Sequence, residues 1–150
     1  MDSRDERIIL ETADEADALA TVLTSGRMDG VTDLFRALDL PSPTIIWRPS
    51  LLDLPHPVIR GAARTLCLQR SGEQDHTFVD SADFAAIEDW AMVLDPVEEG
   101  RDFVYRHYGR NIAEIAGCDM SGLRVSDFAA RNPGFAVFFL ALYRSVLARD

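Results

Sequence analysis

The stretch that decides the fold, DFVYRHYGRNIAEIAGCDMSGLRVSDF (residues 102–128), changes character three times. It opens with an alternation of aromatic and polar residues, which is typical of a β-strand whose two faces meet different surroundings. Gly109 ends that strand, a short helical turn follows, and Gly117 ends the turn before another begins. The sequence therefore predicts one strand followed by several short helices.

The residues before this stretch predict a partner strand. WAMVLDP (residues 90–96) is an apolar run of strand length, and VEEGRD supplies a turn that contains glycine. Two strands joined by such a turn form an antiparallel hairpin. We expect the hairpin to span residues 90–108, with Phe103 and Tyr105 on the face that meets the last helix.

The last segment, RNPGFAVFFLALYRSVLARD (residues 131–150), predicts the longest helix of this half. Asn132 is suited to cap it, and Pro133 is suited to its first position. One face is apolar, and three further residues widen it, so the helix should be covered on more than one side. The face holds Phe135, Phe138, Phe139, Leu142 and Val146, and Val137, Leu140 and Ala141 widen it.

The N-terminal half predicts helices with one extended segment between them. Thr12 and Glu15 have the spacing of a capping box, and Gly26 would end the helix that follows. Further helices are expected over residues 29–40 and 57–70, and TIIWR (residues 44–48) predicts a strand or extended segment. The polar SGEQDH (residues 71–76) is the best domain boundary. We therefore expect a helical and mixed segment over 1–76 and a second domain over 77–150.

Charge excludes some classes of partner. The 150 residues carry a net charge of −10, which argues against binding to nucleic acid or to an anionic membrane surface. No apolar run approaches the roughly 20 residues of a membrane span, and Cys67 and Cys118 lack metal or redox spacing. We expect a cytoplasmic protein. The acidic N-terminal segment and the mildly basic C-terminal segment favour packing of one part on another or on a partner.

Catalysis and metal binding find little support. His107 and Cys118 could form a base and nucleophile, but no third group completes them, so we predict no enzyme. The acidic residues near the middle of the chain lack the glycine and the ligand alternation of a calcium loop, and are more typical of a solvated helix start. We predict no metal; the cofactor is unknown, and none is predicted. These acidic residues are Asp80, Asp83, Glu88 and Asp89.

The order of hairpin, short helices broken by glycine, and long helix resembles the first half of a bacterial PAS domain. The resemblance covers roughly residues 78–149, through SADFAAIEDW, DFVYRHYGRNIAEIAG and DMSGLRVSDF. It implies an α+β fold in which the sheet and the broken helices enclose a small cavity. It also implies three more strands after the long helix, whereas the chain ends at Asp150, so we expect a fragment of a longer protein.

The resemblance implies a sensory or regulatory domain of signal transduction, which senses a small molecule or relays a state to a partner or output domain. Any ligand is then expected between sheet and helices, beside Tyr105, His107, Ile112, Phe135 and Phe139. The alternative is a dimerisation or protein-interaction module whose cavity is filled by side chains. These two functions differ in whether the space between Tyr105, Ile112 and Phe139 is empty or packed.

We also expect a homodimer. A hairpin of two strands is marginal alone and leaves unpaired strand edges, so residues 44–54 or a second copy of the chain could complete the sheet. The alternative is that the N-terminal helix folds back on its own hairpin. The expected interface combines the apolar stripe of that helix with the outer hairpin face, through Leu19, Val22, Leu23, Val104 and Tyr108.

Overall fold

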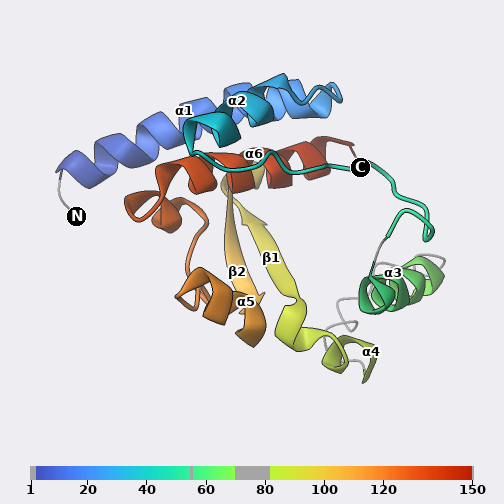
Figure 1. The fold of residues 1–150 in the computed structure, drawn as a ribbon. Coiled ribbons are helices and arrows are strands. Elements are labelled where there is room, and N and C mark those ends of the chain that lie inside the picture. Colours follow the sequence, from blue (N-terminus) through green and yellow to red (C-terminus); the bar gives the residue numbers. More distant parts are fainter. Residues whose placement is uncertain (1–2, 55, 70–81, 150) are drawn as a thin grey trace. The chain divides into compact units, whose positions relative to one another are not determined.

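The computed structural model describes residues 3–54, 56–69 and 82–149. The chain is a mixed α+β protein with a two-stranded antiparallel sheet and a mainly helical N-terminal part, as predicted (Figure 1). Its contacts define two compact units, neither of which is continuous in sequence. The predicted boundary at 71–76 lies outside the described residues. The first unit comprises Met1–Ile45, Val93–His107 and Met120–Asp150, and the second comprises Ile46–Met92 and Tyr108–Asp119.

Each unit has its own helices. The first unit holds α1 (Ser3–Thr24), α2 (Asp29–Ala37), the 3-10 helix η4 (Ser126–Ala130) and α6 (Pro133–Arg149). It also holds most of β1 (Met92–Val97) and β2 (Asp102–Tyr108), with η3 (Glu98–Gly100) between them. The second unit holds α3 (Pro57–Gln69), α4 (Ala82–Ala85), η2 (Glu88–Trp90) and α5 (Arg110–Ala116).

Helix α1 begins at Ser3, so the predicted start at Thr12 is wrong. Residues 3–11 contain neither glycine nor proline and consist largely of good helix formers, so helix continues through the expected cap. Thr12 is buried within the helix instead of capping it. The predicted end is confirmed, because Gly26 has φ +84° and the N–H groups of Gly26 and Arg27 donate to the carbonyls of Leu23 and Val22.

Helix α2 confirms the predicted helix but ends at Ala37, three residues short of the predicted end at residue 40. Asp39 has φ +57° and donates its N–H to the carbonyl of Arg36, while Leu40 donates to the carbonyl of Phe35. These two bonds satisfy carbonyls at the end of the helix. The left-handed residue that such a helix end needs is usually glycine, and here it is Asp39. Val31 and Phe35 form its buried face.

The predicted hairpin is confirmed, and its turn is tightly defined. Glu98, Glu99 and Gly100 have φ values of 52°, 59° and 83° in succession. For Glu98 and Glu99 the left-handed region is unfavourable, so contacts around the turn must hold them there. Phe103 and Tyr105 are buried, as expected for the inner face of β2.

The second edge of β2 is paired within the same chain. Tyr105 donates its N–H to the carbonyl of Leu123 and accepts from Gly122, and Val125 donates to the carbonyl of Phe103. An antiparallel bridge joins Val104 to Arg124. The expectation that both strand edges are unpaired is therefore wrong for β2, because the segment after α5 returns along it.

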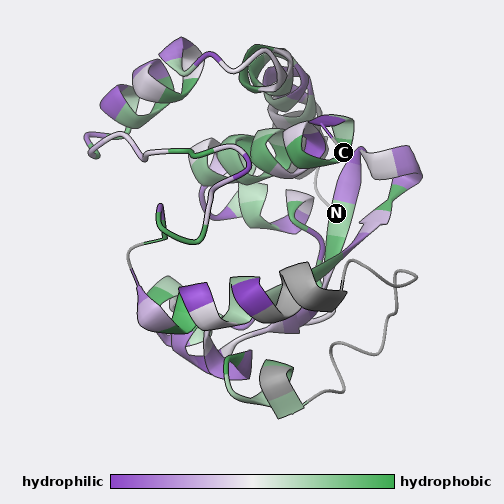
Figure 2. Ribbon diagram, turned by 90° about the vertical axis from the view of Figure 1, so that its right-hand side faces the viewer, coloured by the Kyte–Doolittle hydropathy of each residue, from purple (hydrophilic) through white to green (hydrophobic). Residues whose placement is uncertain are grey.

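Helix α6 forms the centre of the first unit, as its apolar sequence predicted. Asn132 accepts the N–H of Phe135 at 3.2 Å, and Pro133 occupies the first turn. In Figure 2 the ribbon of α6 is green along most of its length, and Figure 1 shows α1 running alongside it. The helix is therefore covered on more than one side. Its buried residues are Ala136, Val137, Phe138, Leu140, Ala141 and Ser145.

The second unit contains the predicted helix α3. Residues 44–54, which begin at the end of the first unit's N-terminal segment, form no strand. Residues 44–48 do not pair with the sheet, whose strand order is β1–β2, so the suggestion that this segment completes the sheet is wrong. Pro43 and Pro49 bracket the segment and limit its backbone pairing. In the second unit Gly109 donates its N–H to the carbonyl of Ala91 at 2.9 Å, which joins the start of α5 to the end of η2.

Within the described ranges, no helix is both long and apolar enough to cross a membrane. Cys118 is a free thiol, and the side chain of Cys67 lies outside the described residues.

Candidate functional site

The inner face of β2 meets a row of aromatic rings that begins at the hairpin and continues along α6 to α2. Phe103 packs edge-on against Tyr143, with ring centroids 5.4 Å apart. Tyr143 stacks on Phe139 at 6.1 Å, and Phe139 stacks on Phe135 at 6.0 Å. Phe35 of α2 meets Phe135 and Phe138 edge-on at 6.1 and 5.0 Å. We call these rings the aromatic row. It consists of Phe103, Tyr143, Phe139, Phe138, Phe135 and Phe35.

Four of the five predicted ligand residues lie in the first unit. Tyr105 is buried on β2, and His107 is half-buried near the end of that strand. Phe135 and Phe139 are half-buried members of the aromatic row, and their rings are stacked. Ile112 is half-buried on α5, in the second unit. The predicted ligand site itself stays a prediction.

Two of the predicted interface residues are buried within the chain, and three are half-buried. Leu19 and Leu23 of α1 are 8% and 0% exposed within the single chain, because α1 packs on α6 and η4. The N-terminal helix therefore folds back on its own chain, mainly on α6 and η4, whereas the alternative to an interface had named the hairpin as its partner. Val22 and Val104 are half-buried, and Tyr108 is half-buried in the second unit.

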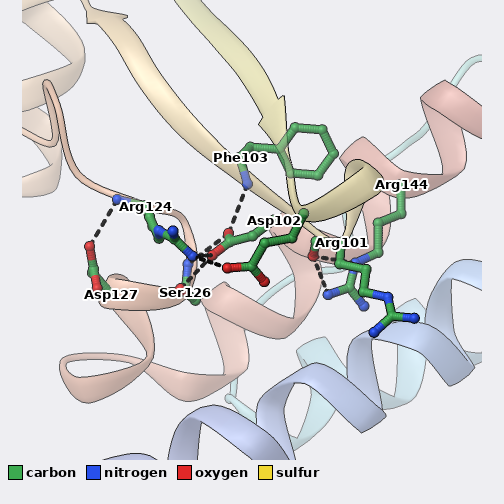
Figure 3. Close-up of polar contacts among 8 residues, drawn as sticks. Arg101, Asp102, Phe103, Arg124, Ser126, Asp127 and Arg144 are labelled. Carbon is green, nitrogen blue, oxygen red and sulfur yellow. Dashed lines mark hydrogen bonds and ion pairs between the residues drawn. The ribbon is translucent and has the colours of Figure 1, made fainter.

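A polar junction at the start of β2 was not predicted from the sequence. Asp102 is only 5% exposed, and its Oδ1 accepts the N–H of Phe103 at 2.8 Å and that of Ser126 at 3.3 Å (Figure 3). Its Oδ2 accepts the hydroxyl of Ser126 at 2.6 Å. A buried carboxylate normally requires such donors. This junction, which we call the Asp102 junction, ties the start of β2 to the start of η4.

Arg124 joins the Asp102 junction to the hairpin turn. Its guanidinium donates to the carboxylate of Glu98, and its Nη1 lies 3.9 Å from Oδ2 of Asp102. The bond to Glu98 and the charge of that carboxylate raise the pKa of Arg124, so it stays charged. Asp127 accepts the Arg124 backbone N–H at 2.9 Å, which fixes the local chain direction.

A second polar junction is centred on Arg144 of α6, whose side chain is 11% exposed. Nε donates to the carbonyl of Arg101 at 2.9 Å, and Nη2 donates to the same oxygen. Nη1 donates to the carbonyl of Ala13 at 3.1 Å and to Oδ1 of Asp17 at 2.7 Å. The Asp17 pair fits the predicted attraction between an acidic N-terminal segment and a basic C-terminal one.

The sequence contained one sign of this second junction. Arg144 is the first charged residue in α6 after Pro133, within an otherwise apolar stretch. An arginine on a helix covered on more than one side must find acceptors or reach solvent. That argument could have marked Arg144 as a polar anchor, although it could not have identified the acceptors.

In the second unit, burial raises the pKa of the Tyr108 phenol, and the neighbouring Cys118 and Asp119 add to the rise. The phenol therefore keeps its proton at neutral pH and can donate a hydrogen bond.

The described residues also form an open hollow beyond the end of α2, with a volume of about 410 Å³. Its lining contains none of the predicted ligand residues. It is lined by Thr32, Arg36, Asp39, Leu40, Pro41 and Ser42.

Comparison with protein-family models, with curated proteins and with solved structures finds no match to this chain.

Proposed function

We propose that the chain is a non-catalytic, PAS-like regulatory domain of bacterial signal transduction. It senses a small molecule, or relays a state to a partner or output domain, in the cytoplasm. The order of elements supports this proposal, because the hairpin β1–β2 is followed by the short helices α5 and η4 and then by the long α6. The resemblance over residues 78–149 supplies the class of function.

The observation that carries the proposal is the inner face of β2 beneath α6. Phe103 meets Tyr143 there, Tyr105 is buried two residues further along β2, and His107 is half-buried near the strand end. Apolar walls with a few polar groups are what small-molecule sites usually offer. The proposed ligand has an apolar or aromatic body and a polar group that the phenol of Tyr105 or the imidazole of His107 can bond.

The polar junctions support a non-catalytic role. Asp102 and Ser126 bond each other and the backbone, and Arg144 bonds two carbonyls and a carboxylate. A general acid or base needs a position within hydrogen-bond reach of a substrate proton. These groups instead direct their donors and acceptors at the protein itself.

A thermal-shift screen of aromatic carboxylates and heterocycles at millimolar concentration, followed by calorimetry of each hit, tests the ligand proposal. We expect Tyr105→Phe and His107→Ala to weaken a hit about tenfold each, as loss of one polar contact typically does. Tyr108→Phe, a change of the same size on the opposite strand face, should leave the affinity unchanged. A set of hits indifferent to both site variants would contradict the proposal.

The aromatic row favours a second candidate, a protein-interaction module with a filled core. Its rings already pack on one another, with Phe135 and Phe139 stacked, so this part of the core is occupied by side chains. In this case the chain acts as a homodimer, whose accessible apolar residues include Val146 and Leu147 of α6. Light scattering should then give twice the mass of 16.7 kDa. A single-chain mass that persists at high protein concentration would exclude the dimer.

A further inference from the structure

Three polar side chains of α6 hold α1 by its backbone. Arg144 reaches the carbonyl of Ala13, the hydroxyl of Ser145 donates to the carbonyl of Ala20 at 3.2 Å, and Arg149 donates to that of Thr24 at 2.7 Å. Contacts that advance together along both helices show that α1 and α6 run in the same direction. The hydroxyl of Ser145 also lies 2.6 Å from the carbonyl of Ala141 within α6, so it has an acceptor with or without α1. The bonds from Arg144 to Ala13 and from Arg149 to Thr24 form only while α1 lies in this register.

Of these three side chains, Arg144 also bonds the hairpin. Two of its nitrogens donate to the carbonyl of Arg101, the residue between η3 and β2 (Figure 3). A guanidinium is planar and rigid, so its donors keep fixed directions relative to one another. The fork can satisfy the acceptors on Arg101, Ala13 and Asp17 together only when hairpin and α1 are both in place.

The contacts of the hairpin turn link movement of the hairpin to Arg144 of α6. Its residues Glu98 and Glu99 have positive φ, and the guanidinium of Arg124 bonds the carboxylate of Glu98. Gly100 lies against α6, since a β-carbon there would come within 3.1 Å of Cδ1 of Leu147. Because Arg101 directly precedes β2, movement of the hairpin would shift the carbonyl of Arg101.

We propose that Arg144 couples the docking of α1 to the position of the β1–β2 hairpin, so that a change at either element alters the stability of the other. The coupling is reciprocal, because α1 and the hairpin share one interaction free energy. This coupling rests on the proposed function, since it gives a route by which a ligand at the inner face of β2 would affect α1. The docking of α1 would then depend on the position of the hairpin. Arg144 is a positioning residue in this scheme.

Hydrogen exchange of the whole chain in a double-mutant cycle tests the coupling without any ligand. Leu23→Ala loosens α1 at a fully buried position away from Arg144. In the parent protein we expect this change to speed exchange in α1, and also in residues 101–108 by about tenfold, within the range typical of coupled elements. In an Arg144→Gln background the same change should speed exchange in α1 while residues 101–108 respond less than about threefold.

Two further variants separate coupling from general destabilisation. Arg149→Gln removes another arginine contact between α6 and α1, and should leave the response of residues 101–108 to Leu23→Ala intact. Arg144→Lys keeps the charge but lacks the planar fork, and should lose that response as Arg144→Gln does. It also provides the cycle if Arg144→Gln does not fold.

An equal response of residues 101–108 with and without Arg144 would overturn the proposal, because the coupling would then run through apolar contacts such as Phe103 with Tyr143. A parent protein in which Leu23→Ala leaves residues 101–108 unchanged would overturn it as well. Both outcomes are independent of the ligand screen, so failure of the coupling and failure of the sensory proposal can be told apart.

Discussion

Replacing Asp102 with alanine should destabilise the protein by about 3 kcal/mol. The change removes a buried carboxylate that accepts three hydrogen bonds, two from Ser126 and one from the backbone of Phe103. Each bond to a charged acceptor is worth about 1.5–3 kcal/mol, and the long 3.3 Å bond and the bond to the adjacent residue contribute least. Arg124 adds little, because its side chain is 45% exposed and its Nη1 lies 3.9 Å from Oδ2 of Asp102.

The measurement is urea unfolding followed by circular dichroism, with a shifted midpoint at unchanged slope. Asp95→Ala is the matched control, since Asp95 lies on the same hairpin but is 52% exposed and pairs with Arg106 at 3.8 Å. Its loss should change the free energy of unfolding by less than about 0.5 kcal/mol. Asp102→Asn keeps one acceptor oxygen, so its free energy of unfolding should lie between those of Asp102→Ala and Asp95→Ala.

A double-mutant cycle identifies the partner. Ser126→Ala alone should destabilise the chain by about 1 kcal/mol, but it should add almost nothing once Asp102 is alanine, because the hydroxyl has already lost its acceptor. An Asp102→Ala variant as stable as the Asp95→Ala control would refute the reasoning, and so would fully additive losses at Asp102 and Ser126.

The remaining predictions concern the second unit. Gly109→Ala should destabilise it by about 2 kcal/mol, because the new methyl group would lie 2.5 Å from a backbone oxygen of η2. Gly61→Ala, inside α3 and facing open space, should instead stabilise it by about 0.5–1 kcal/mol; urea unfolding followed by tryptophan fluorescence reports both, since both tryptophans lie in this unit. The hydroxyl and N–H of Ser50 lower the pKa of Asp53, so Ser50→Ala should raise that pKa in an NMR titration. This stabilisation is present above the ordinary pKa of aspartate and is lost as the pH falls through the lower folded-state pKa.

Local sequence patterns correctly predicted the features that depend only on neighbouring residues. The cap at Asn132, the alternation in β2 and the stop at Gly26 each depend on a few neighbouring residues, and all three are confirmed. The start of α1 was wrong for the same reason, since the capping-box pattern at Thr12 competes with a preceding run that is equally helical.

The polar junctions depend on pairs that local patterns cannot reveal. Ser126 meets Asp102 across 24 positions because the chain returns along β2, and the acceptors of Arg144 lie as far away as Ala13. The predicted ligand residues were chosen by analogy with a fold family, and their role awaits the ligand screen.

The pairing of α1 with α6 has a consequence for synthesis on the ribosome. Ala20 and its partner Ser145 are 125 positions apart, and chains grow at about 5–20 residues per second. The apolar stripe of α1 therefore emerges roughly ten seconds before the helix that covers it. During that interval the apolar stripe of α1 is exposed on the nascent chain. We expect chaperones to bind α1 at this stage, and truncated products to aggregate through it.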